Sequence, residues 1–281
     1  MRMLGLSSVV LISMSLLFGC SSNEQLSKKD TNSKETATSA ANLEDVTNAY
    51  RDFAIGEISQ FVKATEEFTA AVKSGDIEKA KELYPTARMY YERSEPIAEV
   101  FGDLDPKIDA REGDVPEEEW TGYHRIEKGL WEENTTKGYE EYADQLLKDT
   151  KLLRAKVETV EVTPDVLITG AVDLLNEVST SKVTGEEDRY SHTDLYDFAA
   201  NVQGAEKIYE LLQPALEKKD QALSEKIGEH FNQVNQLLEK HKKDDKYILY
   251  TELQDSEIKE LSQAIDALAE PLSQLGIVME G

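Results

Sequence analysis

The chain is poor in cysteine and in basic residues. Cys20 is the only cysteine among 281 residues, so a disulfide within the chain is excluded. The 31 lysines and arginines are outnumbered by 56 aspartates and glutamates, which gives a formal net charge of −25 at pH 7. A surface this negative repels nucleic acid and anionic lipid headgroups, and it favours cations as ligands.

Several catalytic motifs are absent as well. The sequence has no glycine-rich phosphate loop, no Gly-x-Ser-x-Gly turn, no cysteine pair and no His-Glu-x-x-His zinc-protease motif. These absences argue against nucleotide chemistry, serine hydrolysis and thiol redox chemistry. Metal-dependent hydrolysis stays open, because an open metal position and a base such as Glu127 would be enough for it.

The amino terminus has the pattern of a secretory signal followed by a lipid anchor. Arg2 supplies a positive charge, and residues 4–18 form an apolar run too short for an ordinary membrane span. The run ends in Leu-Phe-Gly-Cys, which resembles the lipobox of bacterial lipoproteins. We predict a signal peptide over residues 1–19, lipidation of Cys20, palmitate included, and a place on the extracytoplasmic face of the cell membrane. Loss of Arg2 would change the formal charge from −25 to −26.

The rest of the chain divides into a tether and a folded domain. Residues 20–41 are mostly small and polar, so they cannot repay the entropy of folding, and we expect a flexible tether. Residues 42–281 can form a sizeable core. Apolar residues recur there at three- and four-residue steps, which predicts an all-α domain. A total of about eight helices would suit two packed four-helix bundles. Five of them are predicted over residues 139–160, 164–180, 191–216, 221–242 and 255–275.

A helical region is also predicted over residues 76–101, before the middle of the chain. Pro85 and Pro96 predict a break or kink there at one or both positions. A loop rich in aspartate and glycine follows, up to Pro116. The next helix is predicted to begin at residues 116–119, where proline and three glutamates suit a first turn.

That next helix carries the most informative motif of the sequence, His-x-x-Glu. Residues three apart share a helix face, so the side chains of His124 and Glu127 can converge on one ion. Bulky apolar neighbours such as Ile126 and Leu130 predict that one side of this helix is buried. A single imidazole among carboxylates suits iron or manganese and also accepts zinc.

Three acidic segments could complete such a site. Four residues of the first segment step by four, three and four along one helix face: Arg88, Glu92, Glu95 and Glu99. The following loop has Asp103, Asp105 and Asp109. The third segment, residues 184–194, contains Glu187 and His192, and His192 is open between a ligand, a ligand-supporting residue and a helix-start residue. We expect His230 and His241 to be surface histidines.

Five stretches of the sequence together resemble the EfeO/EfeM family of iron-uptake proteins. They are residues 90–99 (YYERSEPIAE), 101–105 (FGDLD), 120–131 (WTGYHRIEKGLW), 187–195 (EDRYSHTDL) and 198–202 (FAANV). The resemblance spans nearly all of the folded region. The family is related to the imelysin peptidase-like proteins. The resemblance implies a fold of two four-helix bundles with a metal site at the His-x-x-Glu motif.

The resemblance also implies ligands and partners. By the resemblance, His124 and Glu127 are the residues of the family's metal-binding motif, and Glu95, Asp105 and Glu187 are further ligands. The implied partners are a membrane ferrous-iron permease and a haem-type peroxidase. Full-length EfeO proteins begin with a cupredoxin domain, which this chain lacks, so it resembles the shorter EfeM form.

These observations predict a lipid-anchored binding protein that captures iron, as Fe²⁺ or Fe³⁺, and presents it to a permease. An enzyme is the less favoured interpretation, because capture by carboxylates explains the charge and the anchor together. Three alternatives stay open: a metal-dependent peptidase of the imelysin type, a binder of acidic polysaccharide through bridging cations, and a purely structural surface protein.

Overall fold

The computed structural model describes residues 29–280, and these residues are almost entirely helical. The predicted signal peptide and Cys20 lie outside the described residues. Of the described residues, 39–280 form one compact unit and 29–38 belong to a separate one. The first helix, α1 (Lys29–Ser74), begins inside the segment predicted as a tether.

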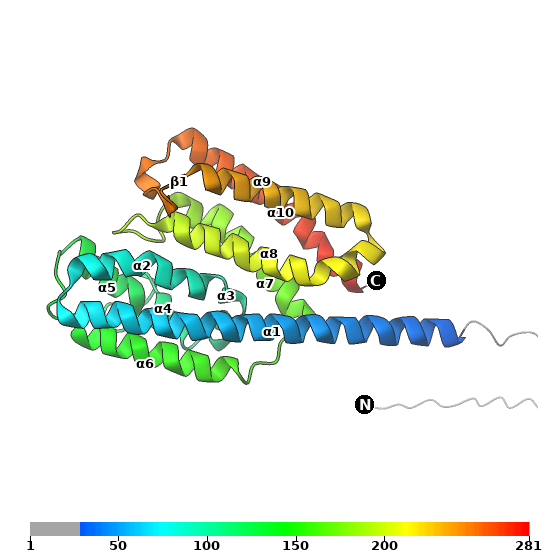
Figure 1. The fold of residues 1–281 in the computed structure, drawn as a ribbon, viewed down its shortest axis with the longest axis horizontal. Coiled ribbons are helices and arrows are strands. Elements are labelled where there is room, and N and C mark those ends of the chain that lie inside the picture. Colours follow the sequence, from blue (N-terminus) through cyan, green and yellow to red (C-terminus); the bar gives the residue numbers. More distant parts are fainter. Residues whose placement is uncertain (1–28, 281) are drawn as a thin grey trace, which may run out of the picture. The chain divides into compact units, whose positions relative to one another are not determined.

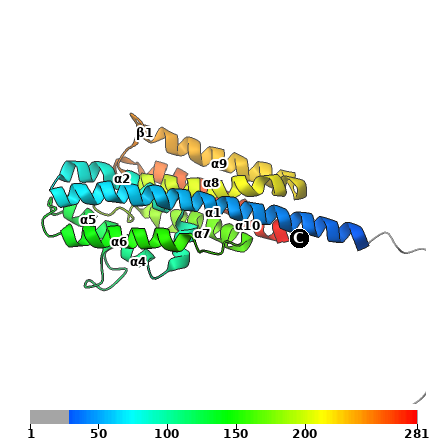
Figure 2. The same cartoon turned by 60° about the horizontal axis from the view of Figure 1, so that its bottom comes forward.

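The amino-terminal half of the compact unit is a group of helices around α1. Its other long members are α2 (Ile77–Glu92), α5 (Gly122–Trp131) and α6 (Glu140–Val157). Figure 1 shows α1 running between α2 and α6. Two short helices, α3 (Glu95–Ala98) and α4 (Asp105–Asp109), fill the connection from α2 to α5. Figure 2 shows α4 on the side of α6.

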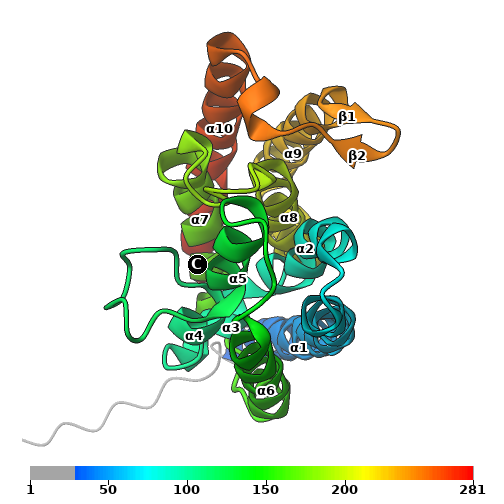
Figure 3. The same ribbon diagram turned by 90° about the vertical axis from the view of Figure 1, so that its left-hand side faces the viewer.

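The carboxyl-terminal half is a second group of four helices. They are α7 (Pro164–Thr180), α8 (Asp194–Lys219), α9 (Gln221–Lys240) and α10 (Asp255–Glu280), and each packs on its neighbours. A small hairpin of β1 (Lys242–Lys243) and β2 (Lys246–Tyr247) joins α9 to α10. The view along the helices shows the two groups side by side (Figure 3). They meet where α2 packs on α8 and α3 packs on α7. The predicted all-α fold of two four-helix bundles is confirmed.

Local sequence signals explain several helix starts. The Asp76 side chain accepts a hydrogen bond from the Lys79 amide at 3.0 Å and caps α2. Thr163 does the same for α7, where Pro164 stands at the first helical position. Asp220 caps α9 by accepting from the Leu223 amide at 2.9 Å. Each cap gives a partner to a backbone N–H that the helix itself leaves free.

The predictions for residues 76–119 need correction. Helix α2 continues through Pro85, and the break falls after Glu92, just before Pro96. The short 3₁₀ helix η1 (Glu99–Phe101) ends the region predicted as helical, and the region predicted as a loop contains helix α4. The predicted helix start at residues 116–119 is wrong, since these residues form turns and α5 begins at Gly122.

Gly122 allows α4 and α5 to pack at very short range. Its φ of +88° lies in the region that only glycine adopts without strain. A Cβ atom at this position would also collide with the backbone carbonyl of Ile108. The glycine therefore lets the end of α4, which carries Asp109, lie directly against the start of α5.

Candidate metal centre

His124 and Glu127 lie inside the protein, as the His-x-x-Glu motif predicts. Their exposed fractions are 1% and 0%. The His124 Nδ1 atom is 3.0 Å from Glu127 Oε2, and the other oxygen of Glu127 accepts hydrogen bonds from the amides of Tyr190 (3.0 Å) and Ser191 (2.7 Å). Burial alone would raise the pKa of Glu127, but His124 and the hydrogen bonds from Ser191 lower it. Glu127 is therefore a fully hydrogen-bonded carboxylate that fixes the imidazole.

The opposite ring nitrogen of His124 has no hydrogen-bond partner among the described residues. Its Nε2 atom is buried and lies 3.7 Å from Asp109 Oδ1 and 3.8 Å from Glu187 Oε1. Burial alone would lower the pKa of His124, but the Glu127 and Asp109 carboxylates raise it. In the neutral imidazole, the Glu127 carboxylate holds the proton on Nδ1 and the Nε2 lone pair is free. One ligand atom from each of the three residues lies within 4.8 Å of the others. This arrangement can hold one cation.

Three separate parts of the chain supply these atoms. His124 belongs to α5, Asp109 is the last residue of α4, and Glu187 lies between the 3₁₀ helix η2 (Lys182–Thr184) and α8. Burial and nearby carboxylates raise the pKa of Asp109 to about 7. Burial has the same tendency at Glu187, but Lys182, His124 and other cations lower its pKa to about 2.

A further carboxylate, Asp188, lies on the Nδ1 side of the imidazole. Its Oδ1 atom is 3.9 Å from His124 Nδ1 and accepts a hydrogen bond of 2.8 Å from the Tyr84 hydroxyl. Thr193 donates to Oδ2 of the same carboxylate at 2.5 Å. Burial and Glu127 raise the pKa of Asp188 to about 6. His124, Glu127 and Asp188 form another set of possible ligands on this side of the ring.

Two buried cations lie among the carboxylates. The Arg88 guanidinium is 1% exposed and pairs with carboxylates from four elements, among them Glu92, Asp109, Glu187 and Asp197. The second cation is Lys182, also 1% exposed, whose ammonium has contacts to several acids. They are Glu92 at 2.7 Å, Glu95 at 3.5 Å and Glu187 at 3.7 Å. The buried negative charge is thus partly neutralised by the protein itself.

An acidic cavity adjoins the cluster. Its volume is about 170 Å³. Asp109 and Glu187, two residues beside the His124 Nε2 atom, are part of its wall. The remaining wall residues come mainly from α3, α4, α7 and the loop after α4: Glu95, Asp105, Pro106, Ala110, Arg111, Asp114, Val115 and Glu177. The cavity therefore extends from the region around α4 to Asp109 and Glu187, two carboxylates of the candidate metal centre.

The structure brings together three of the five predicted metal ligands. His124, Glu127 and Glu187 lie in the buried cluster, while Glu95 and Asp105 line the acidic cavity. Glu95 accepts a hydrogen bond of 2.7 Å from Asn201, and Asp105 accepts one from Tyr91.

Sequence reasoning missed Asp188 and Asp197 and ranked Asp109 below its neighbour Asp105. For Asp188 and Asp197 a signal was present, since both lie in the stretches that carried the family resemblance or directly between them.

The other three histidines lie outside the groups of possible metal ligands. His192 has a φ of +57°, is half-buried and shapes the loop before α8, where its carbonyl accepts from the Tyr250 amide. His230 is half-buried on α9. The prediction of a surface position is wrong for His241, which is 7% exposed because the hairpin after α9 folds over it.

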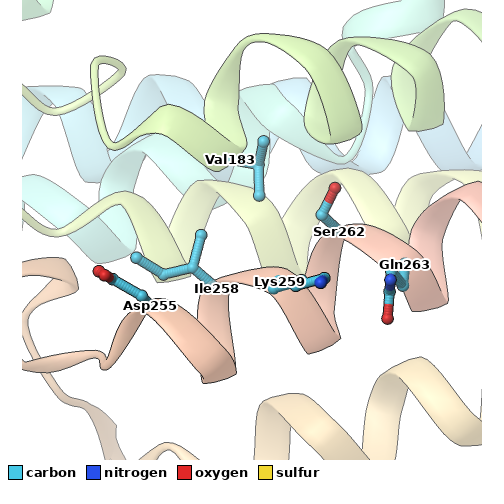
Figure 4. A pocket seen from close by; sticks show the side chains of 6 residues that line it. All are labelled: Val183, Asp255, Ile258, Lys259, Ser262 and Gln263. Carbon is cyan, nitrogen blue, oxygen red and sulfur yellow. The ribbon is translucent and has the colours of Figure 1, made fainter.

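A larger pocket is lined by few side chains that could bind a metal ion. It has a volume of about 520 Å³ and is lined by Val183 and by five residues of α10: Asp255, Ile258, Lys259, Ser262 and Gln263 (Figure 4). Asp255 is the single carboxylate among these six residues, and Lys259 adds a positive charge. The lining therefore does not supply a set of metal ligands. The acidic cavity is therefore the better candidate for an ion.

Comparison with known proteins identifies the family. The model of the imelysin family, Peptidase_M75, matches residues 46–275. An "Efem/EfeO family lipoprotein" of Staphylococcus haemolyticus (strain JCSC1435) is 50% identical over 287 residues, which cover 98% of this chain and 99% of the relative. The chain belongs to the EfeM/EfeO family. A family member of Staphylococcus aureus (strain NCTC 8325) is 51% identical over 246 residues, covering 85% and 87% of the two chains.

The EfeM/EfeO assignment confirms the family predicted from the sequence motifs. The relatives are named lipoproteins, and their names state no catalytic activity. Among the helices that the structure describes, none has the length and apolar character needed to cross a membrane.

Proposed function

We propose that this EfeM/EfeO protein captures iron outside the cytoplasmic membrane and delivers it to a membrane permease. The observation that carries the proposal is the buried Nε2 atom of His124, which lacks a hydrogen-bond partner within residues 29–280 and faces two carboxylates. A buried polar atom without a partner is costly, and a bound cation would remove that cost.

The chemistry of the donor atoms suits iron as the cargo. Asp109 and Glu187 offer carboxylate oxygens and His124 offers a neutral imidazole nitrogen, a set that binds Fe²⁺ or Fe³⁺ and also accepts manganese or zinc. In this arrangement Glu127 orients His124 from the opposite side of the ring. A carboxylate in that position fixes the tautomer and makes the free nitrogen a better donor.

The acidic cavity supports capture from the outside. Glu95 and Asp105 line it together with Asp109 and Glu187. Six carboxylates and one cation, Arg111, are part of its wall, and such an excess of one sign concentrates ions of the opposite sign. We assign Glu95 and Asp105 to the approach of the ion, and Asp109 and Glu187 to its final binding.

The anchor and the partners complete the proposal. Lipidation of Cys20 would hold the folded unit at the membrane surface, consistent with the naming of its relatives as lipoproteins. The family resemblance implies two partners, an iron permease in the same membrane and a haem-type peroxidase.

A metal-dependent peptidase is the second candidate, because the matching family model has a peptidase name. Hydrolysis would need a carboxylate free to take a proton from water. Both oxygens of Glu127 are already in hydrogen bonds, and its pKa is lowered, so Glu127 is a poor base. Metal-dependent cleavage of peptides that disappears in Glu127→Gln would favour the peptidase over the binding protein.

Calorimetry with ferrous iron under anaerobic conditions tests the proposal. The purified full-length protein should bind iron, and the double variant His124→Ala/Glu127→Ala should not. His230→Ala is the matched control, since it removes a half-buried histidine of α9 and should leave binding unchanged. Absence of binding in the unsubstituted protein would overturn iron capture and would make the peptidase assay the next experiment.

A further inference from the structure

The buried cluster contains two adjoining groups of possible ligands that share one carboxylate. The first group is Asp109, His124 and Glu187, and the second is Glu92, Glu187 and Asp197. All of them come from helices or loops that face each other where the two halves of the fold meet. Helical bundles in which two ligand groups share a carboxylate can hold two metal ions. From the ligands alone, a two-ion site would be expected here.

The second group already contains a cation of the protein. The Arg88 Nη2 atom lies 2.8 Å from Glu92 Oε1, 2.9 Å from Asp197 Oδ2 and 3.3 Å from Glu187 Oε1. It thus contacts every member of the second group. The Lys182 ammonium, 2.7 Å from the other oxygen of Glu92, adds a second positive charge at the same place.

The surroundings hold Arg88 firmly. Its guanidinium lies over the rings of Tyr84 and Tyr123, with 5.8 and 6.0 Å between its Cζ atom and the ring centroids. The residue is 1% exposed and lies one turn before the end of α2. Removing one partner from a buried ion cluster leaves uncompensated charge, which is strongly unfavourable.

The two groups differ in what they lack. In the second group, Arg88 and Lys182 supply positive charge to the carboxylates. In the first group, Arg88 also pairs with Asp109 and Glu187, but the Nε2 atom of His124 has no hydrogen-bond partner among the described residues. The first group therefore keeps an open donor atom for an ion, whereas every member of the second group is already paired with Arg88.

We propose that Arg88 takes the place of a second metal ion and limits the centre to one ion per chain. The inference rests on the proposed iron capture, since it concerns the number of ions that the same centre holds. A fixed guanidinium also lowers the negative potential at the first group. The bound ion is then held by fewer net charges, which suits a protein that must pass its cargo on.

Ion stoichiometry tests the inference in the purified full-length protein, with Mn²⁺ as the probe because it is stable in air. The unsubstituted protein should bind one Mn²⁺ per chain. Arg88→Met, which removes the charge and keeps much of the side-chain volume, should bind two. Arg88→Lys, which keeps a cation, should bind one. A folded Arg88→Met protein that binds a single ion would overturn the inference.

Asp197→Asn provides a test that does not require Arg88 to be removed. If Arg88 fills the second group, this variant should bind one ion, as the unsubstituted protein does. Two ions in the unsubstituted protein and one in Asp197→Asn would show that a metal enters the second group, and the inference would be wrong. A protein that binds no ion in any form, with His124 intact, would instead refute the proposed capture itself.

Discussion

At the scale of single residues, His124 has different surroundings on its two ring nitrogens. Nδ1 is fixed by Glu127, and Nε2 faces Asp109 and Glu187 without a hydrogen bond. The His-x-x-Glu spacing predicts that the two motif residues share a helix face. It does not show which of them contacts an ion and which supports the other, because that depends on the carboxylates that other elements bring to the ring.

This difference leads to unequal effects of the two motif residues on binding. His124→Ala should abolish tight iron binding, since it removes a donor atom. Glu127→Gln should weaken binding only roughly 10–100-fold, because it removes the group that orients the imidazole. Calorimetry on both variants and on His230→Ala measures this. An equal loss in His124→Ala and Glu127→Gln would instead make Glu127 a direct ligand.

Lys182 gives a second prediction at this scale. It is buried among Glu92, Glu95 and Glu187, so Lys182→Met leaves buried negative charge without its partner. We expect a loss of about 3–5 kcal/mol in the free energy of unfolding. The control is Lys79→Met, which breaks an exposed pair with Glu82 and should cost less than about 1 kcal/mol. Urea unfolding of the metal-free proteins compares them, and equal losses would contradict the burial argument.

At the scale of elements, the helices with a long apolar stripe and a clear cap could be predicted from the sequence. Helix α7 is predicted within its observed bounds, and α9 begins at the predicted Gln221. The short helix α3 lies within the region predicted as helical, residues 76–101. The short helix α4 could not be predicted, because its few residues are stabilised by contacts to α5 and α6 and not by their own sequence. The site depends on α4, since it carries both Asp105 and Asp109.

The positions of α3 and α4 predict a kinetic role for two acidic residues. If Glu95 and Asp105 guide the ion through the cavity, Glu95→Gln/Asp105→Asn should bind iron several-fold more slowly and release it at an unchanged rate. Stopped-flow measurement at low ionic strength separates the two rates, because steering by charge acts mainly on association. Faster release with unchanged association would show that these residues are ligands, as the family resemblance implies. Glu66→Gln/Asp144→Asn, which changes two half-exposed or exposed acids elsewhere, is the matched control.

At the scale of the whole molecule, the excess of negative charge and the packing of the two helix groups together produce the buried cluster of carboxylates and cations. The sequence shows the charge and the helical class, and the family resemblance adds the two-bundle architecture. The contacts of Arg88 could not be predicted, since they join α2 to residues about 100 positions later that meet only when α2 packs on α8. The long-range packing, and not any local pattern, determines which acids receive a cation.

Buried carboxylates predict how the stability of the metal-free protein changes with pH. The pKa values of Asp109 and Asp194 are raised to about 7 by burial, above the value of about 3.9 for an unfolded aspartate. Between these values the folded state binds more protons, so the free energy of unfolding falls as pH rises from about 4 to 7. Glu187 has the opposite sign, with a pKa of about 2, and loses its contribution only as pH falls below about 4.

The metal-free protein should therefore have a higher melting temperature at pH 5 than at pH 7.5, by several degrees. Thermal unfolding in the presence of a chelator measures this, and Asp109→Asn should reduce the difference because it removes one of the responsible groups. Bound iron should reverse the order, since protons compete with the ion for His124 and the carboxylates. A metal-free protein that is more stable at pH 7.5 would contradict the assigned pKa directions.

Anomalous diffraction at the iron absorption edge, from crystals of the iron-loaded protein, locates the captured ion. We expect one iron peak per chain, bonded to His124 Nε2 and to carboxylate oxygens of Asp109 and Glu187, with Arg88 still between Glu92 and Asp197. A peak bonded to His124 Nδ1 and Glu127, or a peak among Glu95 and Asp105 alone, would contradict this expectation.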